Sequence, residues 1–104
     1  MSVSYEDVYN EFLSRVKLDY GIVESKIKKC YLSLKDYSKF PFQLETDIKT
    51  CCQKEISEFH DKWFFVSVKQ LENTKWYYLA AKETFNMYLD LVHLPTKLSN
   101  SDDD

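Results

Sequence analysis

Three cysteines, Cys30, Cys51 and Cys52, are the residues of this 104-residue chain best suited to covalent or metal chemistry. Cysteine thiolates act as nucleophiles, form disulfides and bind soft metal ions. Their spacing, however, lacks the CxxC and HxxxH pairs that structural zinc sites typically use. An odd number of cysteines, in a chain whose acidic first residues predict no secretory signal, indicates reduced thiols. We therefore predict no metal and no cofactor.

The position of the cysteines along the chain gives a further expectation. Cys30 lies ten residues before Phe40 and Cys51 lies eleven after it, so an antiparallel hairpin turning near Phe40 places them at about the same level. We expect packed core thiols there, and a disulfide only in an oxidising compartment. Adjacent residues on a helix point about 100° apart, so we do not expect Cys51 and Cys52 to face one partner together.

The two histidines, His60 and His93, offer little support for catalysis. Nucleophilic catalysis needs a base beside the nucleophile, and His60 has only its chain neighbour Asp61 next to it. His93 lies near the end of an expected helix, where the helix dipole favours a charged imidazole. The single glycine cannot build a phosphate-cradling loop. We predict no catalytic residues and a protein that is not an enzyme.

Lysines gather near the end of the first expected helix. Lys28 and Lys35 share one helical face two turns apart, and Lys29 lies about 100° from Lys28. Acidic residues among them, Glu24 and Asp36, offset this charge, and the chain has one arginine and a net charge of −3. Nucleic-acid binding through Lys28, Lys29 and Lys35 is therefore the alternative function, and nucleic acid is an unlikely partner.

The elements that carry these residues are predicted to be helices. The chain is 44% hydrophobic and 16% aromatic, which is typical of a folded domain. It contains one glycine and two prolines, whereas a protein of many short strands needs many turn-forming residues. Composition therefore favours an all-α fold.

A first apolar stripe predicts one long helix over residues 4–37. Its members are Tyr5, Val8, Phe12, Val16, Tyr20, Val23, Ile27, Cys30 or Tyr31, and Leu34. Steps of three or four residues form one face of a helix. Gly21 lies within the helix and costs about 1 kcal/mol relative to alanine. We expect a bend or a close helix contact at Gly21, and a full break there would give four helices.

A second stripe predicts a helix that follows the break at residues 38–43 and opens with Pro41 at its first position. Its members are Leu44, Ile48, Cys51 or Cys52, Ile56, Phe59, Trp63, Val66 and, at its end, Leu71. The aromatic run at residues 63–68 also suits a strand, but the helical phase continues through it. We therefore predict helix there, with the next break at residues 72–75.

The third predicted helix, residues 75–94, is the most apolar part of the chain and is expected to end at Pro95. Its polar residues, Lys82, Glu83, Asn86, Asp90 and His93, define one narrow face. The apolar remainder needs cover from two neighbouring helices, and any part they leave bare is a candidate partner site. The predicted partner-binding residues are Trp63, Tyr77, Phe85, Met87, Tyr88 and Leu91.

Together these patterns predict an antiparallel three-helix bundle over residues 1–95 and a flexible acidic tail over residues 96–104. A first helix of about 50 Å and a third of about 30 Å differ in length, so we expect the first to bend or to extend beyond the bundle. No membrane span is expected. The predicted function is a cytoplasmic or nuclear, non-enzymatic interaction module that binds a partner helix or peptide, or a second copy of itself, within a larger complex.

Overall fold

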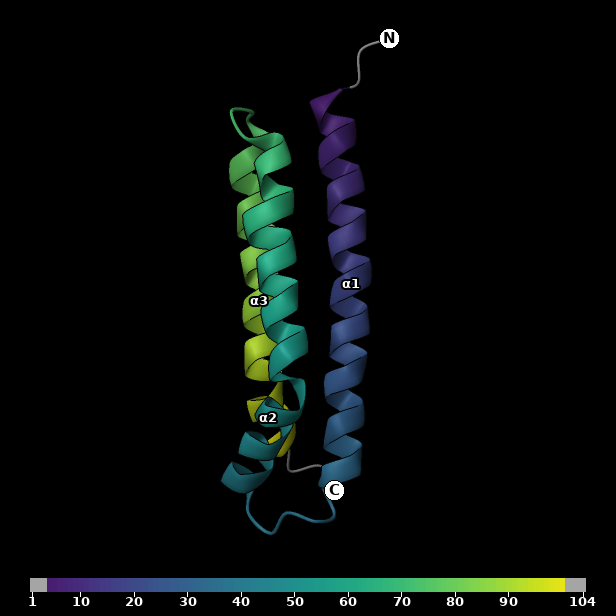
Figure 1. Ribbon diagram of the computed structural model, residues 1–104, viewed down its shortest axis with the longest axis vertical. Helices are drawn as coiled ribbons and strands as arrows, with labels where there is room; N and C mark the ends of the chain where they lie inside the picture. Colours follow the sequence, from purple (N-terminus) through teal and green to yellow (C-terminus); the bar gives the residue numbers. More distant parts are fainter. Residues whose placement is uncertain (1–3, 101–104) are drawn as a thin grey trace.

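The computed structural model describes residues 4–100, apart from the side chains of Val66 and Ser67. Three long helices pack against one another, and this described part contains no strand, which confirms the predicted all-α three-helix bundle. Along the chain the elements are α1 (Tyr5–Leu34), α2 (Pro41–His60), η1 (Asp61–Ser67), η2 (Val68–Leu71) and α3 (Trp76–Ser99). Figure 1 shows α1 running beside α2 and α3 in an elongated rod of 58 × 22 × 17 Å.

The first residues of α1 and α2 are set by local chemistry. Ser4 caps α1, because its Oγ accepts a hydrogen bond from the backbone N–H of Glu6 at 3.1 Å. Phe40 is extended, and Pro41 then opens α2 at its first position, where its missing N–H has no helical acceptor to lose.

α1 has a neighbour of matching length, because α2 runs on past His60, as the second apolar stripe predicts. It continues without interruption through η1, a π-helical segment, and η2, a 3-10 segment, to Leu71. This path is as long as α1, whose 30 residues form one unbroken helix. The predicted bend or overhang of α1 is therefore wrong, and so is the four-helix alternative.

Gly21 lies on the exposed side of α1, and the expectation of a close helix contact there is also wrong. No described atom lies within 4 Å of a Cβ built at Gly21. The glycine also has no positive φ that would require it. Gly21 therefore lowers helix stability without serving a packing role within this chain.

Gly21→Ala should raise the free energy of unfolding by about 1 kcal/mol, because alanine lowers the entropy of the unfolded chain and its methyl group meets open space. Thermal denaturation followed by circular dichroism should show a midpoint about 4–8 °C higher. An unchanged or lower midpoint would mean that Gly21 has a role that this fold does not show.

The aromatic run at residues 63–68 is helical, as predicted, but its hydrogen-bonding pattern is π-helical and then 3-10. The buried side chains around it are Phe59, Trp63, Val68 and Leu71. Their spacings of four, five and three residues match one α turn, one π turn and one 3-10 turn. The wider π turn shifts the buried face by one residue relative to an α-helix. Val66 is a member of the predicted second stripe, but its side chain is not among those that the structure describes.

α3 does not end at Pro95. Pro95 is buried inside the helix, which continues to Ser99, and the Ser99 Oγ–H donates to the Pro95 carbonyl at 2.6 Å. Proline removes only its own hydrogen bond, and Leu98 packs against the core to hold the last turn. The expected end of the helix at Pro95 is therefore wrong, and residues 101–104 of the predicted tail lie outside the described residues.

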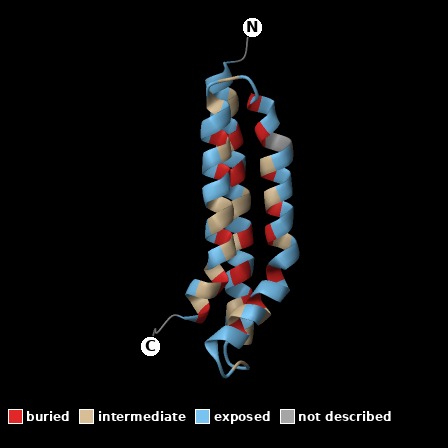
Figure 2. Cartoon of the chain, turned by 90° about the vertical axis from the view of Figure 1, so that its left-hand side faces the viewer, coloured by how far each residue is buried: buried red, intermediate tan, exposed pale blue. Residues whose placement is uncertain are grey.

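Buried side chains line the inner sides of all three helices, as Figure 2 shows. The buried hydrophobic residues are Phe12, Val16, Val23, Ile27, Cys30, Leu44, Ile48, Cys52, Ile56, Phe59, Trp63, Val68, Leu71, Ala80 and Leu91. Within residues 4–100, no helix combines the length and apolarity needed to cross a lipid bilayer.

Candidate functional site

Five aromatic rings come together where the end of α2 and the start of η1 lie against the middle of α3. This aromatic cluster consists of His60, Phe64, Phe65, Phe85 and Tyr88. His60 is its centre, because its ring lies 5.2 Å from Phe64, 5.1 Å from Phe65 and 4.5 Å from Tyr88 between centroids. Phe85 connects to both Phe64 and Tyr88 at 6.2 Å.

The aromatic cluster is largely a surface feature. Phe65 is 59% exposed and Phe85 is 43% exposed, while His60, Phe64 and Tyr88 are half-buried. Rigid aromatic rings that are already held by one another lose little conformational entropy on binding, and aromatic residues are enriched at interface cores. The cluster therefore has the composition and exposure of a docking surface.

A groove continues from the aromatic cluster along the junction of α2 and α3. It has a volume of about 440 Å³ and is lined by Thr46, Lys49, Thr50, Gln53, Ile56, Ser57, Tyr88 and Val92. Tyr88 belongs to both the groove and the cluster. The groove and the cluster therefore adjoin at Tyr88.

Two of the six predicted partner-binding residues are not available to a partner. Trp63 and Leu91 are buried in the chain's own core. The indole N–H of Trp63 donates to the Asp19 carboxylate of α1 at 2.7 Å, and its ring meets Phe12 edge-on at 5.8 Å. Both residues therefore help to hold the bundle together, and their burial does not favour the predicted partner contact.

The other four predicted residues keep some exposure. Phe85 and Tyr88 belong to the aromatic cluster, Tyr77 is exposed near the start of α3, and Met87 is partly buried against the core. The structure thus brings two of the six together on the surface of α2 and α3, and Tyr77 and Met87 take no part in the ring contacts of the cluster.

Sequence reasoning missed His60, Phe64 and Phe65 as members of this surface. Phe64 and Phe65 follow Trp63 directly, and a π turn directs the tryptophan inward and leaves Phe65 exposed. The available signal was the run WFF itself, because three consecutive large aromatic residues cannot all face one core.

A second apolar surface, also missed, lies between α1 and α2. Leu18 and Ile22 are exposed one turn apart on α1, beside Gly21. They line a groove of about 1130 Å³ that extends along α1 to Cys30, Leu34 and the facing residues Asp47, Thr50 and Cys51 of α2. The pair Leu18 and Ile22, four residues apart and outside the predicted stripe, was its signal in the sequence.

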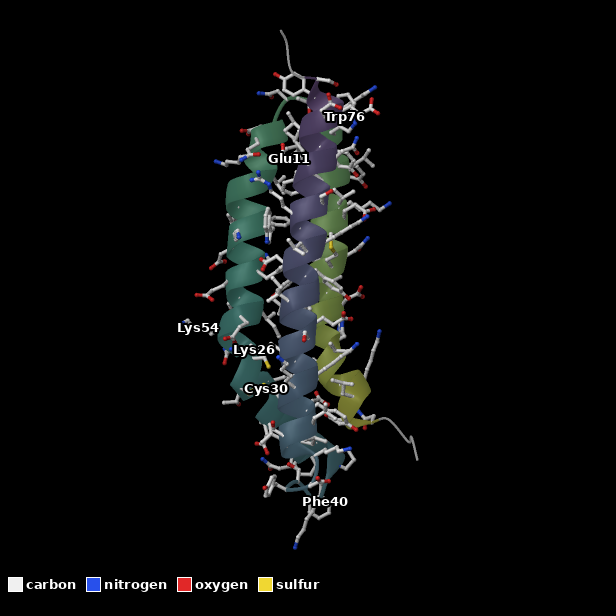
Figure 3. All side chains as sticks on the ribbon, turned by 90° about the vertical axis from the view of Figure 1, so that its right-hand side faces the viewer. Glu11, Lys26, Cys30, Phe40, Lys54 and Trp76 are labelled. Atoms are coloured by element: carbon white, nitrogen blue, oxygen red, sulfur yellow. A yellow bond between two sulfur atoms is a disulfide. The ribbon has the colours of Figure 1, made fainter. Side chains whose placement is uncertain are left out.

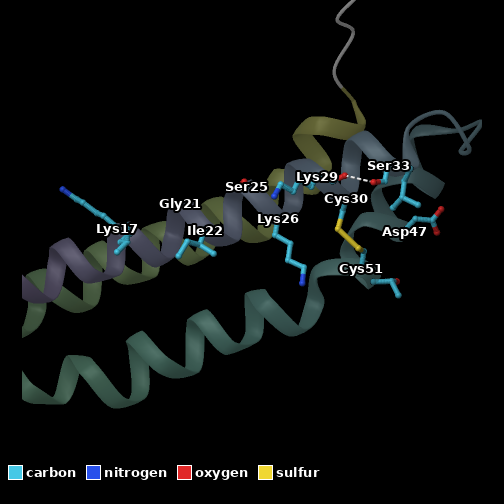
Figure 4. Close-up of a pocket in the computed structure, with 13 residues that line it drawn as sticks. Lys17, Gly21, Ile22, Ser25, Lys26, Lys29, Cys30, Ser33, Asp47 and Cys51 are labelled. Carbon is cyan, nitrogen blue, oxygen red and sulfur yellow. Dashed lines mark hydrogen bonds between the residues drawn. A yellow bond between two sulfur atoms is a disulfide. The ribbon is translucent and has the colours of Figure 1, made fainter.

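An ion pair crosses this groove between α1 and α2. The Lys26 ammonium donates to the Glu55 carboxylate at 2.5 Å, and Figure 4 shows Lys26 pointing from α1 towards α2. This hydrogen bond raises the pKa of Lys26 and lowers that of Glu55. The pair therefore stays ionised at neutral pH and links α1 to α2.

The three lysines proposed for nucleic-acid contact lie in different environments. Lys28 lies 3.9 Å from Glu24, Lys35 lies 6.0 Å from the centre of the Tyr31 ring, and Lys29 lines the groove between α1 and α2. An acidic neighbour at Lys28 and separate directions for the others do not favour a phosphate-binding patch.

The Sγ atoms of the three cysteines lie within 4.8 Å of one another, and Figure 3 shows Cys30 in the half of the rod nearer to the Phe40 turn. Cys30 and Cys51 form a disulfide between α1 and α2 (Figure 4), so the expectation of reduced, packed thiols is wrong for this pair, although the two residues do lie at the same level of the hairpin. The buried Cys52 Sγ lies 3.1 Å from the Cys30 Sγ. The expectation that Cys51 and Cys52 do not face the same partner is therefore wrong, because Cys30 reaches between their two directions.

Neither histidine pairs with a cysteine among the described residues. His60 belongs to the aromatic cluster, with its Nδ1 3.5 Å from the Asp61 carboxylate, and the His93 Nδ1 lies 3.0 Å from the Leu89 carbonyl within its own helix. Both contacts are structural.

No protein-family model matches this chain, and it matches neither a curated protein nor a solved structure. What can be concluded about its function therefore comes from the residues and surfaces described above.

Proposed function

We propose that the chain is a non-enzymatic protein-interaction module whose partner docks on the aromatic cluster of α2, η1 and α3. One observation carries this proposal: five rings pack into a single cluster that the chain leaves at its surface, with Phe65 59% and Phe85 43% exposed. An isolated exposed ring is ordinary, but a connected group of rings is a typical binding feature.

The shape of the surface favours an amphipathic helix as the partner. The aromatic cluster and the adjoining groove follow the line between α2 and α3, and a helix laid along such a line contacts it with residues three and four apart. Apolar side chains on the partner would cover Phe65 and Phe85, while Gln53 in the groove suits polar partner residues and Lys49 is paired with Glu45 at 2.8 Å. A second copy of the chain is the other partner of this type.

Phe65→Glu tests this proposal, with Phe42→Glu as the matched control. Both residues are exposed phenylalanines, at 59% and 69%, but Phe42 lies near the opposite end of the rod and contacts only Phe40 among the rings. A charge placed in a docking site should weaken binding by at least about 2 kcal/mol, or roughly 30-fold, as at other interface hot spots. Circular dichroism should show that both variants remain helical.

The measurement has two parts. Sedimentation equilibrium over a range of concentrations tests self-association, and affinity capture from native extract, followed by titration of the captured protein, tests an external partner. We expect one of these interactions to be lost in Phe65→Glu and kept in Phe42→Glu. If every interaction survives Phe65→Glu unchanged, the aromatic cluster is not the docking surface.

A further inference from the structure

The three cysteine sulfurs form the densest group of metal-binding atoms in the described part of the chain. The Sγ atoms of Cys30, Cys51 and Cys52 all lie within 4.8 Å of one another, and no His, Asp or Glu from residues 4–100 joins them. For a metal–sulfur bond of about 2.3 Å, three sulfurs in a plane around one ion lie roughly 4 Å apart. Cys30 and Cys51 are bonded to each other and the Cys52 Sγ lies 3.1 Å from the Cys30 Sγ, so small side-chain rotations after reduction of the disulfide would give the three sulfurs this spacing.

We propose that, once the Cys30–Cys51 disulfide is reduced, the three thiolates form a binding site for one Cu(I) ion. Thiolates are soft ligands that select Cu(I) among the common biological metals, together with zinc and iron–sulfur clusters. Structural zinc is almost always four-coordinate, and the described residues supply three ligands. Cu(I), which accepts three sulfur ligands, fits this donor set.

The surroundings of the sulfurs suit such an ion. Cys30 and Cys52 are buried, whereas Cys51 is exposed on α2 and lines the groove between α1 and α2. The exposed thiolate gives the ion a path from solvent, and the buried pair shields it from further ligands. Lys26 and Lys29 line the same groove, where the Lys26 ammonium is paired with the Glu55 carboxylate (Figure 4).

Cu(I) binding follows reduction of the disulfide. A phosphine reductant and water convert the disulfide into two thiols and a phosphine oxide. The three thiols then lose three protons to the solvent as one Cu(I) ion binds, which leaves a complex with a charge of −2. Because three protons are displaced for each ion bound, binding should strengthen as the pH rises.

The test is a competition titration of the reduced protein, freed of reductant under nitrogen, against the Cu(I) complex of bathocuproine disulfonate. We expect one Cu(I) per chain and three sulfur ligands by copper X-ray absorption. The oxidised protein, whose Cys30 and Cys51 are joined, should bind at least about 100-fold more weakly. The Cu(I) affinity of Cys52→Ser should fall by the same factor. Removal of a metal ligand costs more affinity than the roughly 10–100-fold that is typical of changes around the ligands.

Cys52→Ala serves as a second variant if serine does not fold at this buried position, and circular dichroism shows which variant is folded. Three results would overturn the proposal: reduced wild type that takes no Cu(I) from the chelator, a folded Cys52 variant that binds as tightly as wild type, or Zn²⁺ bound more tightly than Cu(I). Because the cysteines lie outside the aromatic cluster, the Phe65→Glu variant should bind Cu(I) normally, which separates this test from that of the proposed interaction.

Discussion

Replacing Trp63 with alanine should lower the free energy of unfolding by about 3–5 kcal/mol, a large share of the stability of a domain of this size. Trp63 is 5% exposed, and its side chain connects η1 to α1. Its loss removes the edge-on contact with Phe12 and leaves the Asp19 carboxylate without its indole donor.

Trp63→Phe separates these two contributions. It keeps an aromatic ring but removes the N–H donor, and we expect a loss of about 1–3 kcal/mol from the unpaired Asp19 carboxylate. Phe65→Ala, at the exposed neighbouring position, is the control and should change stability by less than about 1 kcal/mol. Urea denaturation measures all three variants. Equal stability losses for Trp63→Ala and Phe65→Ala would contradict the inward direction of Trp63.

Leu91→Ala should cost about 2–5 kcal/mol, because Leu91 is fully buried in the middle of α3 and alanine leaves a cavity. Leu79 is the matched control: it lies on the same helix but is 45% exposed. Leu79→Ala should change stability by about 0.5 kcal/mol or less.

The two leucine variants also distinguish a core role from a binding role. If Leu91 served a partner, its replacement would weaken binding while leaving the isolated chain stable. We expect the reverse: lower stability of the isolated chain in urea or heat, with an unchanged docking surface in the molecules that remain folded. A stable Leu91→Ala variant that fails to bind would contradict the position of Leu91 in the core.

Much of the fold was predictable because helical spacing persists over long stretches. The stripes of α1 and α2 identify buried residues such as Phe12, Val16, Ile27, Ile48 and Phe59 directly. The capping serine and the proline at the start of α2 also act locally, within one turn, so sequence alone contains the information that determines them.

The errors at Gly21 and Pro95 have a common cause. Both residues disfavour a helix locally, by roughly 1 and 3 kcal/mol relative to alanine. Packing of the surrounding turns outweighs such costs: Val23 and Ile27 are buried on one side of Gly21, and Leu98 packs beyond Pro95. The local cost of each residue can be estimated from the sequence, but the tertiary contacts that offset this cost cannot.

The candidate docking surface was less predictable than the fold. Apolar residue types indicate that a side chain is either buried in the core or covered by a partner, but they do not distinguish these two cases. The π turn at Asp61–Ser67 decides which of the adjacent residues Trp63, Phe64 and Phe65 enters the core. The cysteine cluster could not be predicted from the spacing within one helix. It forms because α1 packs against α2 and brings Cys30 into contact with both Cys51 and Cys52, which point in different directions.

Site-specific photo-crosslinking shows directly whether a partner docks on the aromatic cluster. The crosslinking residue p-benzoylphenylalanine is placed at position 65 in one protein and at position 42 in another, and both are irradiated in native extract. We expect a discrete covalent adduct from position 65, either a dimer of the chain or one other protein, and none from position 42. Adducts from position 42 alone, or the same adducts from both positions, would contradict the claim.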